Sequence, residues 1–116
     1  MKEFLLVFRK DTTAKEVQQS PEQFQAIYKQ WQDWIGSLAA QNKFSSSGKR
    51  LAPEGQVVKS DKAITNGPFV EIKEAIQGYM FVKADSLNEA TELAKGCPIL
   101  QAGGSVEVRP VMEENS

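Results

Sequence analysis

Two stretches of the chain carry charged side chains at spacings that could hold a ligand or move a proton. The first is the segment 66–74, which reads Asn-Gly-Pro-Phe-Val-Glu-Ile-Lys-Glu, and the second is the segment 106–109, which reads Val-Glu-Val-Arg. A carboxylate can act as a general acid or base, and an arginine can hold an anionic group through paired hydrogen bonds. The catalytic candidates are Glu71, Glu74 and Glu107, and the charged ligand-binding candidates are Arg109 and Lys73.

Four further side chains complete the set of ligand-binding candidates. They are Asn66, Phe69, Tyr79 and Arg50. Asn66 opens an Asn-Gly-Pro turn that should orient the charged segment behind it. Tyr79 begins a buried strand, so it could instead belong to the core, and the case for Arg50 is weaker.

The same charges also have a purely structural interpretation. Arg109 could pair with Glu107, Glu71 or Glu74 in an ion-pair network at the rim of an interface. The charges of the segment 71–74 could equally form a solvated edge, where surface pairs contribute little to stability.

Composition excludes several classes of function. The chain has no histidine and one cysteine, Cys97, so we expect no metal site or cofactor, no disulfide and no imidazole base. Three serines at 45–47 therefore have no histidine to activate them. Cys97 could be a nucleophile, but its place at the end of a predicted helix favours packing. A net charge of −1 argues against nucleic acid and an anionic membrane as partners, and we expect a cytoplasmic protein.

Periodicity predicts strands at 4–9, 77–84 and 106–109. In the first two, both alternating sets of side chains are apolar, with Tyr79 and Phe81 on one face and Met80 and Val82 on the other. In the third, the valines share one face, and Glu107 and Arg109 share the opposite face.

Capping signals predict two helices. Ser20, Pro21 and Gln23 form the start of the first helix, which should end near Asn42. Its expected buried stripe is Phe24, Ile27, Tyr28, Trp31, Trp34, Ile35 and Leu38. Ser86 and Glu89 should form a second capping box, followed by a buried stripe of Leu87, Ala90, Leu93 and Ala94. The segments 43–48 and 98–104 are expected to be loops, and the segments 56–59 and 62–65 a small hairpin.

This order predicts one domain over residues 1–116, of the α+β, ferredoxin-like class, with an antiparallel sheet and both helices on one face. The helices can cover only one face, yet the first and central strands are apolar on both. We therefore expect a homodimer in which a second copy covers the open face, giving a dimeric α+β barrel with the charged candidates inside.

The motifs resemble the DGPF-domain branch of the YCII-related family. The residues that carry this resemblance are the segment 66–74, Gly78-Tyr79, Asn88-Glu89-Ala90, Cys97-Pro98 and the segment 106–110. The resemblance implies a dimeric α+β barrel of ferredoxin-like subunits. A related branch includes a dehydrochlorinase of a chlorinated hydroxyquinol and is associated with a His-Asp pair, which this chain lacks. Asn66 stands where the DGPF motif has Asp, so it cannot act as a base there.

Two functions follow as hypotheses. The first is a small-molecule-binding protein or weak enzyme whose site lies between the sheets of the dimer. The alternative is a non-enzymatic interaction or regulatory module. Its partner could be an extracytoplasmic-function sigma factor, which the family resemblance alone suggests.

Overall fold

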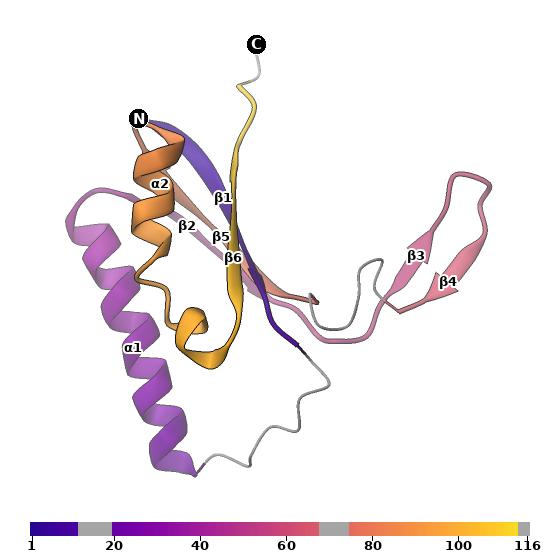
Figure 1. The fold of residues 1–116 in the computed structure, drawn as a ribbon, viewed down its shortest axis with the longest axis horizontal. Coiled ribbons are helices and arrows are strands. Elements are labelled where there is room, and N and C mark those ends of the chain that lie inside the picture. The colour runs from indigo at the N-terminus through magenta and orange to yellow at the C-terminus, as the bar shows by residue number, and fades with distance from the viewer. Residues whose placement is uncertain (12–19, 68–74, 114–116) are drawn as a thin grey trace.

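A computed structural model describes residues 1–11, 20–67 and 75–113. Within these residues, four strands form an antiparallel sheet in the order β2-β5-β1-β6, and α1 and α2 cover one face of it (Figure 1). The elements of this body are β1 (Lys2–Arg9), α1 (Pro21–Ala40), β2 (Phe44–Arg50), β5 (Ile76–Ala84), α2 (Leu87–Ala94), the 3₁₀ helix η2 (Pro98–Ala102) and β6 (Ser105–Pro110). The predicted α+β, ferredoxin-like fold class is confirmed.

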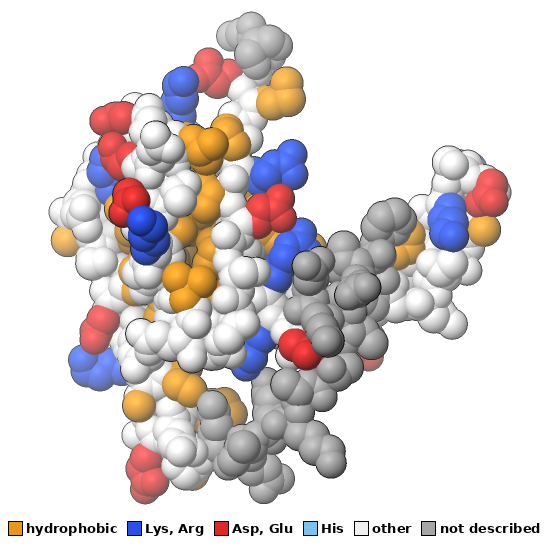
Figure 2. Space-filling view, viewed as in Figure 1, with side chains coloured by type: hydrophobic (Ala, Val, Ile, Leu, Met, Phe, Trp, Pro, Cys, Tyr) orange, Lys and Arg blue, Asp and Glu red, His pale blue; other side chains and the backbone are white. Residues whose placement is uncertain are grey.

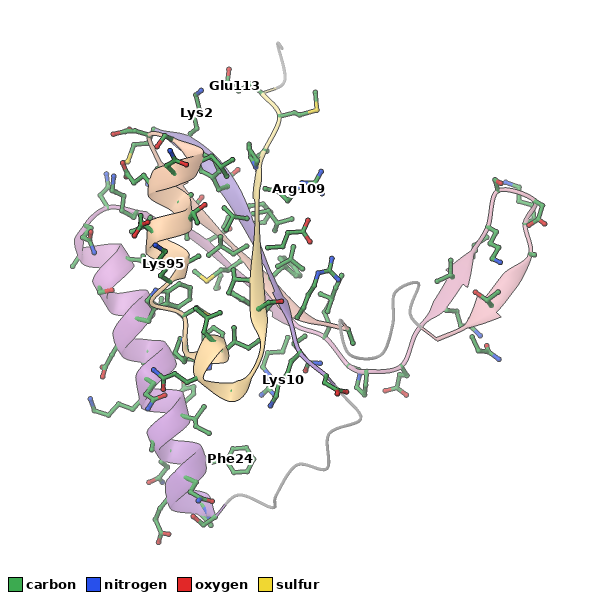
Figure 3. The ribbon with its side chains drawn as sticks, viewed as in Figure 1. Lys2, Lys10, Phe24, Lys95, Arg109 and Glu113 are labelled. Carbon is green, nitrogen blue, oxygen red and sulfur yellow. The ribbon has the colours of Figure 1, made fainter. Side chains whose placement is uncertain are left out.

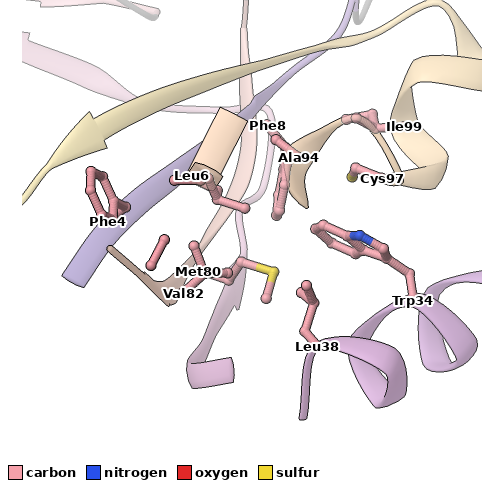
Figure 4. Packing of buried hydrophobic residues seen from close by; sticks show 12 residues of the cluster. Phe4, Leu6, Phe8, Trp34, Leu38, Met80, Val82, Ala94, Cys97 and Ile99 are labelled. Atoms are coloured by element: carbon pink, nitrogen blue, oxygen red, sulfur yellow. The ribbon is translucent and has the colours of Figure 1, made fainter. Parts of the chain in front are cut away.

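The core lies between the sheet and the helices. Alternation along β1 and β5 sends every second side chain to this side, because successive residues of a strand point to opposite faces. Figure 4 shows how these side chains pack with those of the helices and η2. The cluster consists of Phe4, Leu6, Phe8, Trp34, Leu38, Met80, Val82, Ala84, Ala90, Ala94, Cys97 and Ile99.

Helix α1 begins as its sequence predicts. The amide N of Gln23 donates to Ser20 Oγ at 3.2 Å, and the amide N of Ser20 donates to Gln23 Oε1 at 2.8 Å. This reciprocal pair is a capping box that satisfies two of the amides left open at a helix start. At the other end, Gln41 is the C-cap and Asn42 takes a φ of 58°, the left-handed conformation that terminates helices.

The apolar stripe of α1 is buried over its second half only. Trp34 and Leu38 are buried, whereas Phe24 is 60% and Tyr28 66% exposed, so the predicted burial of these two rings is wrong. The physical reason is length: α1 runs past the end of the sheet, and Phe24 lies near its overhanging N-terminal end (Figure 3). The helical period was correct, but the extent of the surface beneath the helix could not be read from it.

Two predicted loops are regular structure. The segment 43–48 is largely β2, which pairs with β5 at the edge of the sheet, and η2 lies within the segment 98–104. Polar side chains suit an edge strand, because its pairing needs only the backbone and its side chains meet water. The Ser45 hydroxyl, for example, donates to Glu3 Oε2 at 2.6 Å.

The predicted hairpin is present as β3 (Gln56–Val58) and β4 (Ile64–Asn66). It projects as an arm, and the strands of the main sheet stand between it and the helices (Figure 1). Val58 and Ile64 lie directly opposite one another on the arm and are 66% and 61% exposed. The radius of gyration is 15.9 Å, compared with about 13 Å expected for a compact chain of this length, which reflects the arm and the overhanging helix.

Among the described residues, no helix has both the length and the apolar character needed to cross a bilayer.

Candidate functional site

The open face of the sheet, on the side away from α1 and α2, has an apolar centre. Leu5 and Val7 of β1 alternate with the core residues of that strand, and Tyr79 and Phe81 do the same on β5. Register places Leu5 opposite Phe81 and Val7 opposite Tyr79. Leu5, Tyr79 and Phe81 are partly buried, and Val7 is only 9% exposed. These strands are therefore apolar on both faces, as predicted.

Tyr79 belongs to this open face and not to the core. Its ring packs edge-to-face against Phe81, with ring centroids 6.3 Å apart. The same ring extends over β2 at Gly48, where a Cβ atom would lie 2.4 Å from its Cδ2 and 2.0 Å from the Tyr79 carbonyl oxygen. Glycine at position 48 thus allows Tyr79 and the neighbouring strand to approach this closely.

A cluster of three charged side chains borders the apolar centre. Arg9 donates to Glu107 Oε1 from Nε at 3.3 Å and from Nη2 at 3.0 Å. Arg109 donates from Nη1 to Glu107 Oε2 at 3.4 Å. Figure 3 shows Arg109 on the side of β6 away from α2, and in Figure 2 basic and acidic side chains alternate along that side. We call this group the Arg9–Glu107–Arg109 cluster.

Electrostatics keep the carboxylate of this cluster ionised. The hydrogen bonds from Arg9, assisted by Arg109, lower the pKa of Glu107 against a smaller opposing effect of burial. A carboxylate with a lowered pKa is a weak proton acceptor near neutral pH. The arrangement is therefore better suited to holding two guanidinium groups in place than to moving a proton.

The structure brings some predicted site residues together and separates others. Glu107, Arg109 and Tyr79 all border the open face, with Glu107 opposite Val7, which in turn lies opposite Tyr79. Asn66 lies on the arm, where its Oδ1 accepts a hydrogen bond from Gln56 Nε2 at 3.1 Å. Arg50 is exposed at the end of β2. Four predicted residues lie outside the described residues, namely Phe69, Glu71, Lys73 and Glu74.

Sequence reasoning missed Arg9 as a site residue. The signal was present, because Arg9 follows Leu5 and Val7 at the two-residue spacing of a strand and so belongs to the open face. In the predicted strand 4–9, it stands only as the last residue. Its side chain is 22% exposed, the least accessible of the cluster.

Cys97 is a packing residue. It is 2% exposed within the core cluster, and burial raises the pKa of its thiol to about 12. Because the thiolate is the reactive form, a thiol in this environment is a poor nucleophile.

The described residues thus define an α+β protein of the ferredoxin-like class whose open sheet face is apolar at its centre and charged at its border. The chain belongs to the YCII-related domain family, which matches residues 4–115. It is 33% identical over 85 residues to an uncharacterized protein of Rhizobium meliloti (strain 1021), an alignment that covers 63% of this chain and 68% of the relative.

One solved structure is similar over almost the full length. It is the 5-chloro-2-hydroxyhydroquinone dehydrochlorinase from Burkholderia phenoliruptrix AC1100 in complex with 2,5-dihydroxybenzoquinone, with 18% identity and a TM-score of 0.49. The match covers 97% of this chain and 96% of that one.

Proposed function

We propose that this protein binds a small organic molecule on the open face of its sheet. The observation that carries the proposal is the strand register that places an apolar surface, formed by Leu5, Val7, Tyr79 and Phe81, next to the Arg9–Glu107–Arg109 cluster. Small-molecule sites combine mostly apolar walls with a few placed polar groups that fix the ligand's orientation. This face has both, and α1 and α2 do not cover it (Figure 1).

A second copy of the chain is the proposed cover of this face. A partly exposed apolar sheet is costly in water, and a two-fold partner presents the same surface in return. The arm formed by β3 and β4 projects on the same side as the open face, with Val58 and Ile64 exposed, so it would reach such a partner. The ligand would then lie between two sheets, in a dimeric α+β barrel.

Membership of the DGPF branch of the family is part of the proposal. Its support is the sequence Asn-Gly-Pro-Phe-Val-Glu-Ile-Lys-Glu at 66–74 followed by Val-Glu-Val-Arg-Pro at 106–110. Catalysis remains a prediction for Glu71 and Glu74, because both lie outside the described residues. For Glu107 it also remains a prediction, although the lowered pKa of this group favours a role in holding the arginines.

A thermal-shift screen of the intact protein tests the proposed binding. The panel contains small phenols, carboxylic acids, amides and carbonyl compounds, and a true ligand raises the melting temperature in a saturable way through mass action. Leu5→Lys should abolish the shift, since it places a charge in the apolar centre, while Gln32→Lys on the exposed side of α1 should not. A complete absence of saturable shifts over the panel contradicts the proposal.

A further inference from the structure

One row of side chains crosses three strands of the open face and joins an aromatic ring to a cation. Phe81 on β5 lies opposite Leu5 on β1, and Leu5 lies opposite Arg109 on β6. Neighbouring strands are about 4.8 Å apart, so the two ends of this row are separated by about 10 Å at the backbone. That span fits a ligand about one ring in size, with its body over Leu5.

The two arginines of the cluster have different roles. Arg9 makes two hydrogen bonds to one oxygen of Glu107, and its side chain is 22% exposed, so it acts as the structural partner of the carboxylate. Arg109 is 70% exposed and contacts the other oxygen through Nη1 alone, at 3.4 Å. A guanidinium has five N–H donors in a planar fork. Arg109 is therefore held loosely from one side and can present its remaining donors to a ligand.

The carboxylate of Glu107 limits which anions suit this position. It lies against Arg109, so a ligand bearing two adjacent negative charges would be repelled by it. A single carboxylate meets less of this repulsion than two adjacent charges would, and it matches the guanidinium fork through two parallel hydrogen bonds.

We propose that Arg109 binds the carboxylate of a compact cyclic monoanion, such as an aromatic monocarboxylate, whose apolar ring lies over Leu5 toward Phe81. This inference rests on the proposed function, since it names the ligand class of the same face. Glu107 is a positioning residue here: with Arg9 on one side, it orients Arg109 without contacting the ligand's ring.

The test uses three probes with the intact protein: benzoate, the neutral isostere benzamide, and acetate, which has the charge without the ring. Isothermal titration calorimetry should give benzoate an affinity at least about tenfold higher than benzamide, the size expected of a charge-assisted hydrogen-bonded pair. Benzoate should also bind at least about tenfold more tightly than acetate, because acetate has no ring to bury against the apolar surface. Arg109→Met should remove the preference for benzoate over benzamide. Lys95→Met is the matched control, because it removes one exposed positive charge at the C-cap of α2 and should leave the preference intact.

The outcomes distinguish a failure of this inference from a failure of the proposed small-molecule binding. Equal binding of benzoate and benzamide, unaffected by Arg109→Met, overturns the anion preference and leaves the face as a site for neutral molecules. If none of the three probes binds, the ligand class is also wrong, and the broader screen then decides whether the face binds small molecules at all. Retention of the benzoate preference in Arg109→Met would overturn the role of this residue specifically.

Discussion

Gly48 shows how a single residue shapes the open face. A Cβ atom at this position would lie 2.0 Å from the backbone carbonyl oxygen of Tyr79 and 2.4 Å from its ring. Rotation of the ring could relieve the second contact, but the first involves backbone and requires the two strands to move. Gly36, on the exposed side of α1, meets nothing within 4 Å when a Cβ is added.

These two glycines give a matched pair of predictions. Gly48→Ala should lower the free energy of unfolding by about 1–3 kcal/mol, as overpacking does. Gly36→Ala should raise it by about 0.5–1 kcal/mol, because alanine loses less backbone entropy than glycine in a helix interior. Urea denaturation at one fixed protein concentration measures both. A Gly48→Ala variant as stable as the parent would show that β2 is not held against Tyr79.

Cys97 makes a second prediction at the scale of a residue. Its thiol pKa of about 12 means that the group is almost entirely protonated at pH 8, and its burial keeps it out of contact with solvent. An aromatic disulfide reagent should therefore label the native protein far more slowly than the protein unfolded in guanidinium. Labelling of the native protein at the unfolded rate would place Cys97 in a reactive, accessible site and contradict its packing role.

Residue identity alone predicted part of the candidate site. The pair Glu107 and Arg109 could be assigned to one face because strand alternation is a local property. The contact that organises the cluster joins positions 9 and 107, at opposite ends of the chain. Such a contact depends on β1 pairing with β6, which is a property of the topology and not of either segment by itself.

At the scale of elements, sequence signals predict the features that depend on hydrogen bonds within a few residues. They fail for the features that depend on strand pairing or on the surface beneath a helix. The capping box at Ser20 and the turn at Asn42 follow from hydrogen bonds within a few residues, and both are present. The segment 43–48, which contains most of β2, is predicted as a loop because its serines carry no apolar pattern, while the pairing partner β5 lies far along the chain. The exposed ring of Phe24 has the same origin, since no local pattern tells where the sheet ends.

An ion pair joins α2 to the residue that precedes β2. Lys43 Nζ contacts Glu89 Oε1, and both side chains are partly buried. Hydrogen bonding to Lys43 lowers the pKa of Glu89, and hydrogen bonding to Glu89 raises the pKa of Lys43. Glu89 also lies in the first turn of α2, where the helix dipole favours a negative charge.

This pair predicts a defined pH dependence of stability. A lowered carboxylate pKa means that the contribution of Glu89 is present above its ordinary value of 4.5 and is lost as the pH falls through the lowered folded value. The contribution of Lys43 is present below 10.5 and is lost as the pH rises through its raised value. The stability difference between the parent and Glu89→Gln should therefore be largest between these limits and should shrink toward pH 3.

Urea midpoints of the parent and the variant, measured from pH 3 to pH 7, test this dependence. Glu92→Gln is the control on the same helix, since Glu92 and its partner Lys95 are 68% and 67% exposed and such surface pairs contribute little. A pH-independent difference between the parent and Glu89→Gln would show that the ion pair does not form in solution.

At the scale of the whole molecule, the helices cover one face of the sheet and leave the other face open. Helices α1 and α2 and η2 bury the core on one side of the sheet, while Leu5, Tyr79 and Phe81 remain partly exposed on the other. The arm adds Val58 and Ile64 on the same open side, on a hairpin of a kind that is only marginally stable in water by itself. A second copy would bury both surfaces at once.

Leu5→Lys tests the proposed homodimer. Leu5 lies at the middle of the open face, between Phe81 and Arg109, so a lysine there would place an unpaired charge in a dimer interface while remaining solvated in a monomer. Light scattering should give the parent about twice the chain mass of 12.9 kDa, and should give Leu5→Lys the mass of one chain. Gln32→Lys, with the same charge change on the exposed side of α1, should remain dimeric. A parent protein that scatters as a monomer, or a Leu5→Lys variant that stays dimeric, would show that the second copy does not cover this face.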